Sequence, residues 1–281
     1  MSGSIIEDIK GPYRHFDKIV AKFISKNKFN IIIGYENTTF YSFRHAKRDG
    51  VITILDLAHI HQAESTKISK EWKLLEGLTT REIKFMNLLK SRALKYTDYC
   101  FTLSTWARDS MIKQGFPREN LFIYNLGLNL KLFKQKKYYA VNGPLRLLFV
   151  GTITRKKGLD ILFEAVGTVN KNAIELTLVG PMGDGRFLLD KFKGQFRYVT
   201  FVHHEELVKY YQQADLFIFP SYLDSWAQTV LEAMACGTPV IVSENTGSQE
   251  AVKEGAGFVI PPGDVGALAK NKMVLNSSER N

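Results

Sequence analysis

Cysteine is scarce in this sequence: Cys100 and Cys236 are its only two among 281 residues, and both lie in apolar patterns. No signal peptide is recognisable, so we expect no disulfide and a reducing, cytoplasmic environment. The apolar runs are far shorter than the roughly 20 residues that a membrane-spanning helix needs. These features predict a cytoplasmic protein without membrane-spanning helices.

Acidic residues are also in short supply, with 28 Asp and Glu against 38 Lys and Arg, for a formal net charge of +10. A basic balance favours anionic partners such as a nucleotide, an anionic membrane face or a nucleic acid. The lysines are scattered rather than grouped, so a solvated lysine-rich surface explains the charge equally well. No G-x-G-x-x-G follows a predicted strand, which argues against a dinucleotide oxidoreductase. No His or Cys cluster has the spacing of a zinc site.

Strand-like and helix-like segments alternate along the chain, which predicts an α/β fold with parallel sheets. At 45% hydrophobic residues, the chain is long enough for two cores of ordinary domain size. The basic segment 131–144, which ends in Gly-Pro, is interpreted as a linker. We therefore predict two domains, residues 1–138 and 139–281.

In the first of these domains the patterns predict a short amphipathic helix over residues 17–26, a strand over 29–35 and a second strand over 51–57. A long helical region is expected from about residue 65 to 96, before a strand over 99–103. Ser104 is expected to cap the following helix.

The stretch Ser221–Ser243 has the most distinctive pattern in the chain, and it predicts a loop, a helix and a buried strand. Ser225 and Gln228 have the spacing of a capping box, and Gly237 followed by Pro239 marks the helix stop. Two carboxylates bracket this helix, Asp224 just before it and Glu232 two turns in.

The chemistry of this stretch suits a nucleotide sugar. Helix N-termini attract phosphates, and a carboxylate accepts hydrogen bonds from neighbouring hydroxyls, so Glu232 suits a ribose and Asp224 suits a sugar. On spacing alone a plainer interpretation is favoured, with Asp224 as a simple cap and Glu232 as a solvated side chain.

A second loop adds positive charge. The predicted strand 145–150 ends in Gly151-Thr152-Ile153-Thr154-Arg155-Lys156-Lys157-Gly158, after which a helix begins. Backbone amides of a glycine turn together with basic side chains suit a diphosphate. The strand 176–180 ends in another glycine turn, at Gly180.

These motifs resemble a known family. Asp224-x7-Glu232 followed by Ala-Met-Ala-Cys-Gly-Thr-Pro-Val is similar to the E-x7-E signature of retaining glycosyltransferases of the GT-B fold, family 4 (group 1). The loop 151–158 is similar to the family's G-R-l-x-x-x-K-G, with Lys157 at the lysine position. The departures are Asp224 in place of Glu, Ser225-Trp226-Ala227 in place of Gly-Phe-Gly, and Thr152 in place of Arg, with Arg155 as a substitute positive charge.

The resemblance implies a GT-B protein of two Rossmann-like domains with a cleft between them. The N-terminal domain is expected to be incomplete, since nothing before the strand 29–35 resembles the usual opening strand and glycine-rich turn. The chain is expected to be truncated at both ends, and a divergent member with reduced ends is the alternative. A GT-B phosphorylase is disfavoured because no pyridoxal-phosphate lysine motif is found.

The implied reaction moves a sugar from a UDP- or GDP-sugar to a glycan or lipid-linked acceptor, with retention of configuration and without a metal or other cofactor. The implied catalytic residues are Asp224 and Lys157 together with His61 or His59. The implied donor-binding residues are Gly151, Thr152, Arg155, Lys157, Gly180, Ser225, Trp226, Ala227 and Glu232. The alternative is an impaired fragment that binds a nucleotide sugar or glycan without turnover.

The two histidines after the predicted strand 51–57 are the candidates for the reaction centre. His61 aligns better with the family's L-P-x-x-H pattern, and His59 competes with it. An ordinary loop role is equally open for both. His203 and His204 are expected to be loop and cap residues. We expect no nucleic-acid partner, and a peripheral position at the inner face of an anionic membrane is a hypothesis from the net charge.

Overall fold

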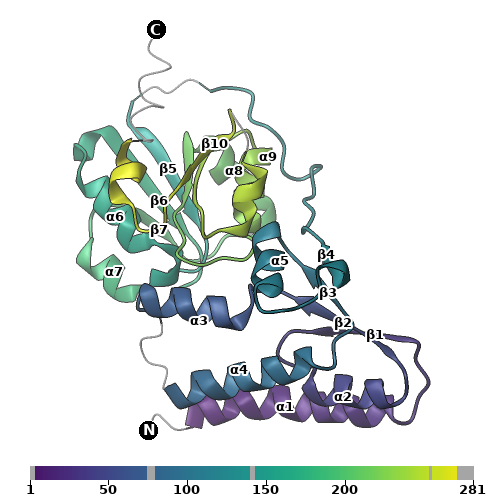
Figure 1. Ribbon diagram of the computed structural model, residues 1–281. Helices are drawn as coiled ribbons and strands as arrows, with labels where there is room; N and C mark the ends of the chain where they lie inside the picture. The colour runs from purple at the N-terminus through teal and green to yellow at the C-terminus, as the bar shows by residue number, and fades with distance from the viewer. Residues whose placement is uncertain (1–3, 75–79, 140–142, 253–254, 271–281) are drawn as a thin grey trace. The chain divides into compact units, whose positions relative to one another are not determined.

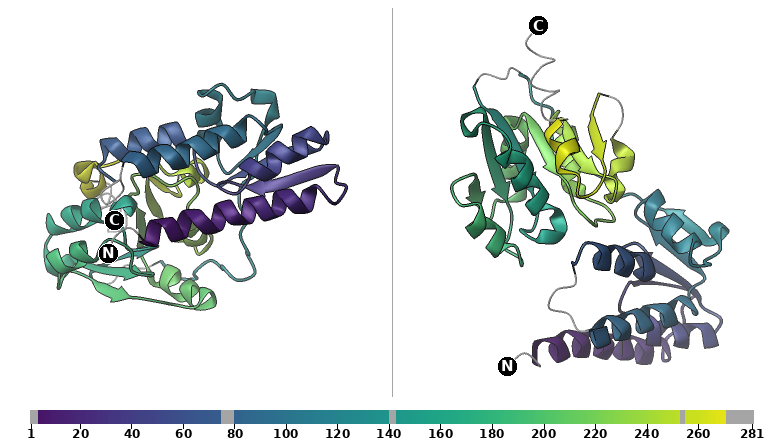
Figure 2. Two further views of the ribbon diagram at one scale, coloured as in Figure 1. Left: turned by 90° about the horizontal axis from the view of Figure 1, so that it is seen from below. Right: turned by 60° about the vertical axis from the view of Figure 1, so that its left-hand side comes forward.

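The computed structural model describes residues 4–74, 80–139, 143–252 and 255–270. The chain forms two compact units, residues 1–125 and 126–281, each built around one parallel sheet with helices between its strands (Figures 1 and 2). The predicted α/β class with parallel sheets is confirmed.

The first unit contains four parallel strands in the order β1-β2-β3-β4. Strands joined in sequential order by right-handed crossovers receive their helices on one face of the sheet. Consistent with this, Phe43 of α2 and Met111 of α5 are buried with Leu55, Leu57 and Cys100 in one apolar cluster. The elements are α1 (Ser4–Ile24), β1 (Ile31–Tyr35), α2 (Phe40–Arg48), β2 (Ile52–Leu57), α3 (Gln62–Glu71), α4 (Thr80–Leu94), β3 (Tyr99–Thr102), α5 (Thr105–Ile112) and β4 (Leu121–Ile123).

The opposite face of this sheet is apolar and open. Successive side chains of a strand point to opposite faces of the sheet. The side chains that point away from the buried cluster are only partly covered. Ile33 of β1 is 61% exposed, next in register to Ile54. The face continues with exposed Ile31, Tyr35, Ile52 and Phe122. A parallel sheet usually has both faces covered, so this unit departs from the usual arrangement.

Three local predictions for the first unit have clear outcomes. The predicted helix 17–26 is too short, because α1 begins at Ser4. The predicted helical region 65–96 contains two helices, α3 and α4, and its residues 75–79 lie outside the described residues. The predicted cap is confirmed: Ser104 Oγ accepts a hydrogen bond from the Ala107 N–H at 3.1 Å.

The second unit has six parallel strands in the order β10-β9-β8-β5-β6-β7. Its central strands are buried along their whole length, as their continuous apolar runs predict. The rings of Phe149 and Phe219 stack across β5 and β8 with centroids 5.8 Å apart. The elements are β5 (Leu145–Val150), η2 (Arg155–Lys157), α6 (Leu159–Gly167), β6 (Ile174–Val179), α7 (Arg186–Lys191), β7 (Arg197–Val199), α8 (His204–Gln213), β8 (Leu216–Phe219), α9 (Gln228–Ala235), β9 (Val240–Ser243), η4 (Gly247–Ala251) and β10 (Gly257–Ile260).

The strand order of the second unit reverses between β5 and β8. From β5 the chain adds β6 and β7 on one side, then crosses to β8 and adds β9 and β10 on the other. Ligands of open α/β sheets bind outside the carboxyl ends of the strands at such a switch point. The loops after β5 and β8 therefore frame the expected ligand position in this unit.

Part of the predicted linker packs on the second unit. Phe133 is 2% exposed, and its ring lies 5.1 Å from that of His204. The Lys136 N–H donates to Cys236 O at 2.9 Å, and its Nζ donates to Ala214 O at 2.7 Å. The described part of the segment 126–139 is thus fixed by an apolar anchor and hydrogen bonds, and the second unit starts earlier than the predicted boundary.

The start of α9 corrects the predicted capping box. The helix begins at Gln228, its N-cap is Ala227, and no side chain caps it. Instead, Asp224 Oδ1 accepts the Trp226 N–H at 3.0 Å, a local turn that keeps residues 225–227 out of the helix. The predicted stop is confirmed, since Gly237 has φ +74°.

Gly158, between η2 and α6, gives a first prediction. It has φ +73°, and a Cβ there would lie 2.0 Å from Pro220 O. We expect Gly158→Ala to lower the unfolding free energy of the second unit by about 2 kcal/mol or more, because backbone strain and overpacking add. Urea unfolding tests this; Gly167→Ala, where a Cβ would meet nothing within 4 Å, is the control. Equal stability of the two variants would contradict the expectation.

Candidate functional site

The loops after β5 and β8 meet through an ion pair between Lys157 and Asp224. Lys157 Nζ contacts Asp224 Oδ2, and their side chains are 21% and 13% exposed. Lys157 also lies over the ring of Phe219, 5.1 Å from its centroid. The two sequence motifs, 67 residues apart, therefore come together at the switch point of the sheet.

Asp224 is held from several directions. Its backbone N–H donates to Asn245 O at 2.9 Å, and its carbonyl accepts the Gly247 N–H at 2.8 Å. One carboxylate oxygen accepts a hydrogen bond from the Trp226 N–H, and the other pairs with Lys157 Nζ. The Asp224 side chain is thus a fixed, partly exposed carboxylate. This corrects the interpretation of Asp224 as a simple helix cap.

The glycine turns lie beside this pair. A Cβ on Gly180 would lie 2.2 Å from Gly151 O, so the two turns approach each other more closely than side chains would allow. Thr152 lies in this loop, and its Cγ2 lies 3.1 Å from where a Cβ on Gly183 would be. Arg155 Nε donates to Asp160 Oδ2 at 3.2 Å, so its guanidinium is engaged by a carboxylate of α6.

Glu232 is buried, not solvated, with 4% exposure. Its Oε2 accepts a hydrogen bond from Tyr211 Oη at 2.7 Å, and its Oε1 lies 3.0 Å from His204 Nε2. Burial and the neighbouring carboxylate raise the pKa of Tyr211 well above its usual 10.0, so the phenol keeps its proton and donates. Two side chains of α8 thus fix the direction of a carboxylate on α9.

His204 and Tyr211 are residues that the sequence analysis missed. His204 was expected to be a loop or cap residue, but it opens α8 and contacts Glu232, while His203 is the N-cap. The helical spacing of the two side chains, seven residues apart, places them on the same face of α8. The seven-residue spacing of His204 and Tyr211 can be read in the sequence, but the sequence does not show that Glu232 is their common partner.

Four buried polar atoms among the described residues of the chain have no hydrogen-bond partner. Buried polar atoms are normally paired. All four lie in the second unit, in or beside the loops that follow β5, β8 and β9, and they mark this edge as a polar region with unused bonding capacity. They are Thr154 Oγ1, Trp226 Nε1, Gln228 Oε1 and Ser248 Oγ.

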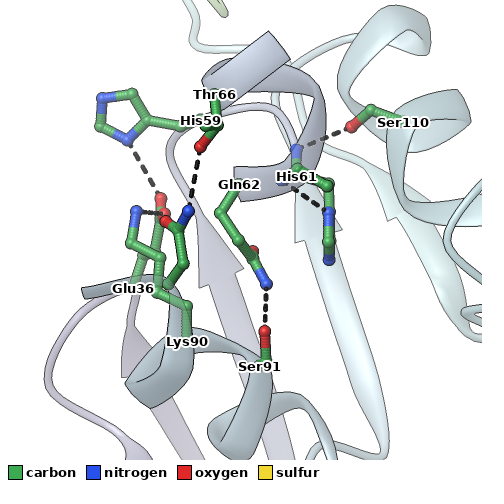
Figure 3. Close-up of polar contacts among 10 residues, drawn as sticks. Glu36, His59, His61, Gln62, Thr66, Lys90, Ser91 and Ser110 are labelled. Atoms are coloured by element: carbon green, nitrogen blue, oxygen red, sulfur yellow. Dashed lines mark hydrogen bonds and ion pairs between the residues drawn. The ribbon is translucent and has the colours of Figure 1, made fainter. Parts of the chain in front are cut away.

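A separate cluster lies at the carboxyl ends of β1 and β2 in the first unit. Glu36, 3% exposed, faces both His59 and Lys90 (Figure 3). Its Oε2 lies 3.0 Å from His59 Nδ1, and its Oε1 pairs with Lys90 Nζ. Burial opposes ionisation of Glu36, but the bond to His59 and the charge of Lys90 prevail and lower its pKa. The sequence analysis did not single out Glu36, which directly follows β1.

The two candidate histidines have different roles in the fold. His61 is buried and is the N-cap of α3, where its Nδ1 accepts the Ala63 N–H at 3.2 Å and its backbone N–H donates to Ser110 Oγ (Figure 3). His59 is 52% exposed, and its Nδ1 is directed at Glu36. His61 is therefore a structural cap here, while the Nε2 of His59 makes no hydrogen bond to the described residues.

The burial of His61 gives a prediction of pH dependence. Burial holds its pKa below the usual 6.5, so the folded state favours the neutral ring. Its contribution to stability is complete above pH 6.5 and is lost as the pH falls further. We expect the melting temperature to fall from about pH 7 to about pH 5.5, and His61→Asn, which keeps a capping side chain, to reduce that fall. An unchanged slope in the variant would contradict this assignment.

Comparison with known proteins identifies the family. The sequence model of the glycosyl transferases group 1 matches residues 131–279, more than half of the chain. The chain belongs to this family. The match covers the second unit from Lys131 onward, which contains Lys157, Asp224 and Glu232.

Individual relatives agree with this assignment. The chain is 29% identical over 203 residues to the amylovoran biosynthesis glycosyltransferase AmsK of Erwinia amylovora, covering 67% of this chain and 50% of AmsK. It is 31% identical over 223 residues to glycogen synthase of Mycobacterium tuberculosis, covering 76% and 53%. The chain thus spans about half the length of the curated relatives it matches.

Solved structures agree on the fold. Anabaena HepE in complex with UDP aligns with a TM-score of 0.71 at 17% identity, covering 92% of this chain and 71% of HepE. At this identity the likeness concerns the fold, which is GT-B with two Rossmann-like domains. Within the described residues, no helix is both long and apolar enough to cross a membrane.

Proposed function

We propose that this group 1 transferase moves a sugar from a UDP- or GDP-sugar to a glycan or lipid-linked acceptor, with retention of configuration as in family 4. The observation that carries the proposal is the meeting of Lys157 and Asp224 at the switch point between β5 and β8. A cation and a carboxylate fixed side by side there match the two ends of a nucleotide sugar, the diphosphate and the sugar hydroxyls.

In the proposed mechanism Lys157 turns from Asp224 to the leaving diphosphate and stabilises its growing charge. The Ala227 amide would supply a further donor, whereas the Gly151 N–H is already bonded to Val179 O at 2.9 Å, which corrects the expected role of the Gly151 amide. Arg155 would contribute only by leaving Asp160, since Thr152 occupies the family's arginine position. Asp224 then accepts hydrogen bonds from the sugar.

Glu232 is proposed to hold the ribose hydroxyls. Both of its oxygens have one protein partner, and each carboxylate oxygen has capacity for a second. His204 and Tyr211 fix its direction, so no side-chain ordering is needed when the nucleotide binds. Trp226 stands at the Phe position of the family's Gly-Phe-Gly, and its larger ring would reshape the donor pocket.

On the acceptor side we propose His59 rather than His61. His59 is half-exposed and has one ring nitrogen beyond the Glu36 contact, whereas His61 is buried and engaged in capping. Glu36 and Lys90 would orient His59 toward the acceptor hydroxyl.

Two further expectations belong to the proposal. Catalysis is proposed to need neither a metal nor another cofactor, since Lys157 and the Ala227 amide would take the charge that a metal would otherwise neutralise. The protein is proposed to work in the cytoplasm, where nucleotide sugars are available to it.

The decisive experiment is a panel of UDP- and GDP-sugars measured for binding by calorimetry and for nucleotide release, with and without EDTA. Release of one nucleotide that Lys157→Ala abolishes is the expected result. Binding without release would favour the alternative, a chain that holds a nucleotide sugar without turnover. No binding to any donor by folded protein would refute the proposal.

A further inference from the structure

The first helix carries an apolar stripe that the fold does not bury. Tyr13, Phe16, Ile19 and Phe23 of α1 are 53%, 56%, 52% and 59% exposed. Their spacing of three and four residues places them on one side of the helix. Four large apolar side chains, all more than half exposed and in one row, are a mark of an interaction surface rather than scattered surface residues.

The packing side of α1 is a different one. Asp17 and Ile24 are 3% and 4% exposed, and α1 lies alongside α2 (Figures 1 and 2). Asp17 accepts the backbone N–H groups of Tyr41 at 2.7 Å and Ser42 at 3.0 Å, which caps the start of α2. These contacts fix the rotation of α1 on the unit, so the apolar stripe is held outward.

A basic groove borders the stripe. Between α1 and α2 the side chains of Lys18, Lys22, Arg44, His45 and Arg48 line one open groove. Lys18 lies over the ring of Tyr41, 5.3 Å from its centroid. Among the described residues, Asp49 is the carboxylate that contacts this group, 3.7 Å from His45. The oxygens of Asp17 are turned to the amides of α2, so the groove keeps its positive charge.

We propose that this face of α1 and α2 docks on an anionic lipid bilayer. Bulky apolar side chains beside a row of Lys and Arg form the pattern of a helix that lies in the membrane interface. The stripe would enter the boundary between headgroups and acyl chains, while Lys18, Lys22, Arg44 and Arg48 pair with lipid phosphates. A nucleic acid or an anionic glycan would use the groove but would leave the stripe in water, and for this reason a bilayer fits better.

The surface belongs to the first unit and shares no residue with the proposed donor site of the second, so it does not depend on the proposed function. Its test is co-sedimentation of the full chain with vesicles of phosphatidylglycerol and phosphatidylcholine, against vesicles of phosphatidylcholine alone. We expect binding to the anionic vesicles that weakens as salt is added.

Two pairs of variants separate the parts of the surface. Lys18→Glu with Lys22→Glu should weaken binding at least tenfold, since each basic residue near an anionic membrane adds about a fivefold gain. Phe16→Ser with Phe23→Ser should weaken it by a similar factor at constant charge. The matched controls from the second unit are Lys191→Glu with Lys193→Glu, and the exposed pair Phe187→Ser with Phe201→Ser.

The outcomes that overturn the proposal are distinct. One is a wild-type protein that stays in solution with anionic vesicles at low salt. Another is control variants that lose binding as much as the α1 variants do. A third is a wild-type protein that binds no vesicles but self-associates in light scattering, with the self-association abolished by the Phe16 and Phe23 substitutions. That result would assign the stripe to contact with a second copy of the chain. Nucleotide release from the donor panel should be unchanged in both α1 variants, so failure here and failure of the proposed transferase activity are distinguishable.

Discussion

Lys157→Ala should lower the rate of nucleotide release from the donor by roughly 10²- to 10³-fold, the usual effect of removing one group that stabilises charge on a leaving or oxyanionic group. Lys157 is the cation that joins the loops after β5 and β8 through Asp224, so its loss removes the charge at the proposed diphosphate position. The measurement is nucleotide release under saturating donor, with UDP and GDP binding measured in parallel.

The neighbouring lysine provides the control for this prediction. Lys156 lies in the same short helix η2, and the ion pair with Asp224 that carries the proposal is made by Lys157. Lys156→Ala should therefore retain release within a few-fold. Asp224→Asn should lower release while leaving nucleotide affinity nearly unchanged, since Asp224 is assigned to the sugar. Full activity of folded Lys157→Ala would remove Lys157 from the mechanism.

Glu232→Ala should lower the unfolding free energy of the second unit by about 2–4 kcal/mol and also abolish donor binding. The substitution leaves the Tyr211 hydroxyl buried without its acceptor, which costs about 1–3 kcal/mol, and it opens a cavity beneath α9. Few single substitutions are expected to affect both stability and function this strongly.

The conservative variant separates the two effects. Glu232→Gln keeps the volume and one acceptor oxygen for Tyr211, so most of the stability should return in urea unfolding. Donor affinity should stay low, because the charged acceptor for the ribose hydroxyls is gone. Glu206→Ala, on the exposed side of α8, should change neither quantity by more than about 0.5 kcal/mol. Donor binding by Glu232→Gln equal to that of the wild type would contradict the ribose assignment.

Predictions from the sequence were correct where the structure of a segment depends on its own residues and their immediate neighbours. Strand β5 was placed at its observed bounds, Leu145–Val150, because a run of apolar residues between a Gly-Pro and a glycine turn has few alternatives. Ser104 and Gly237 were placed correctly since a cap and a left-handed stop depend on neighbouring residues only. The capping box at Ser225 failed because the Asp224 carboxylate, one residue earlier, accepts the Trp226 N–H, and the helix begins only at Gln228.

Contacts between distant segments could not be predicted. Glu36 has no sequence feature that joins it to His59 and Lys90, which lie 23 and 54 residues away. Glu232 has an ordinary helical position, and its burial follows from Tyr211 and His204 on another helix. In the sequence His61 was the better-aligned candidate and His59 its competitor. The preference changed only when the His61 ring was found capping α3.

The sequence by itself determined the fold class and the family, because alternating strand and helix periods and a motif of fixed spacing are local properties of the chain. It also singled out Lys157, Asp224 and Glu232 as candidate site residues. The tertiary structure decided which of these side chains meet, which are buried and which face water. The strand order of the second sheet brings the loops after β5 and β8 together. The packing of α1 on α2 determines which side of α1 faces outward, toward the proposed membrane.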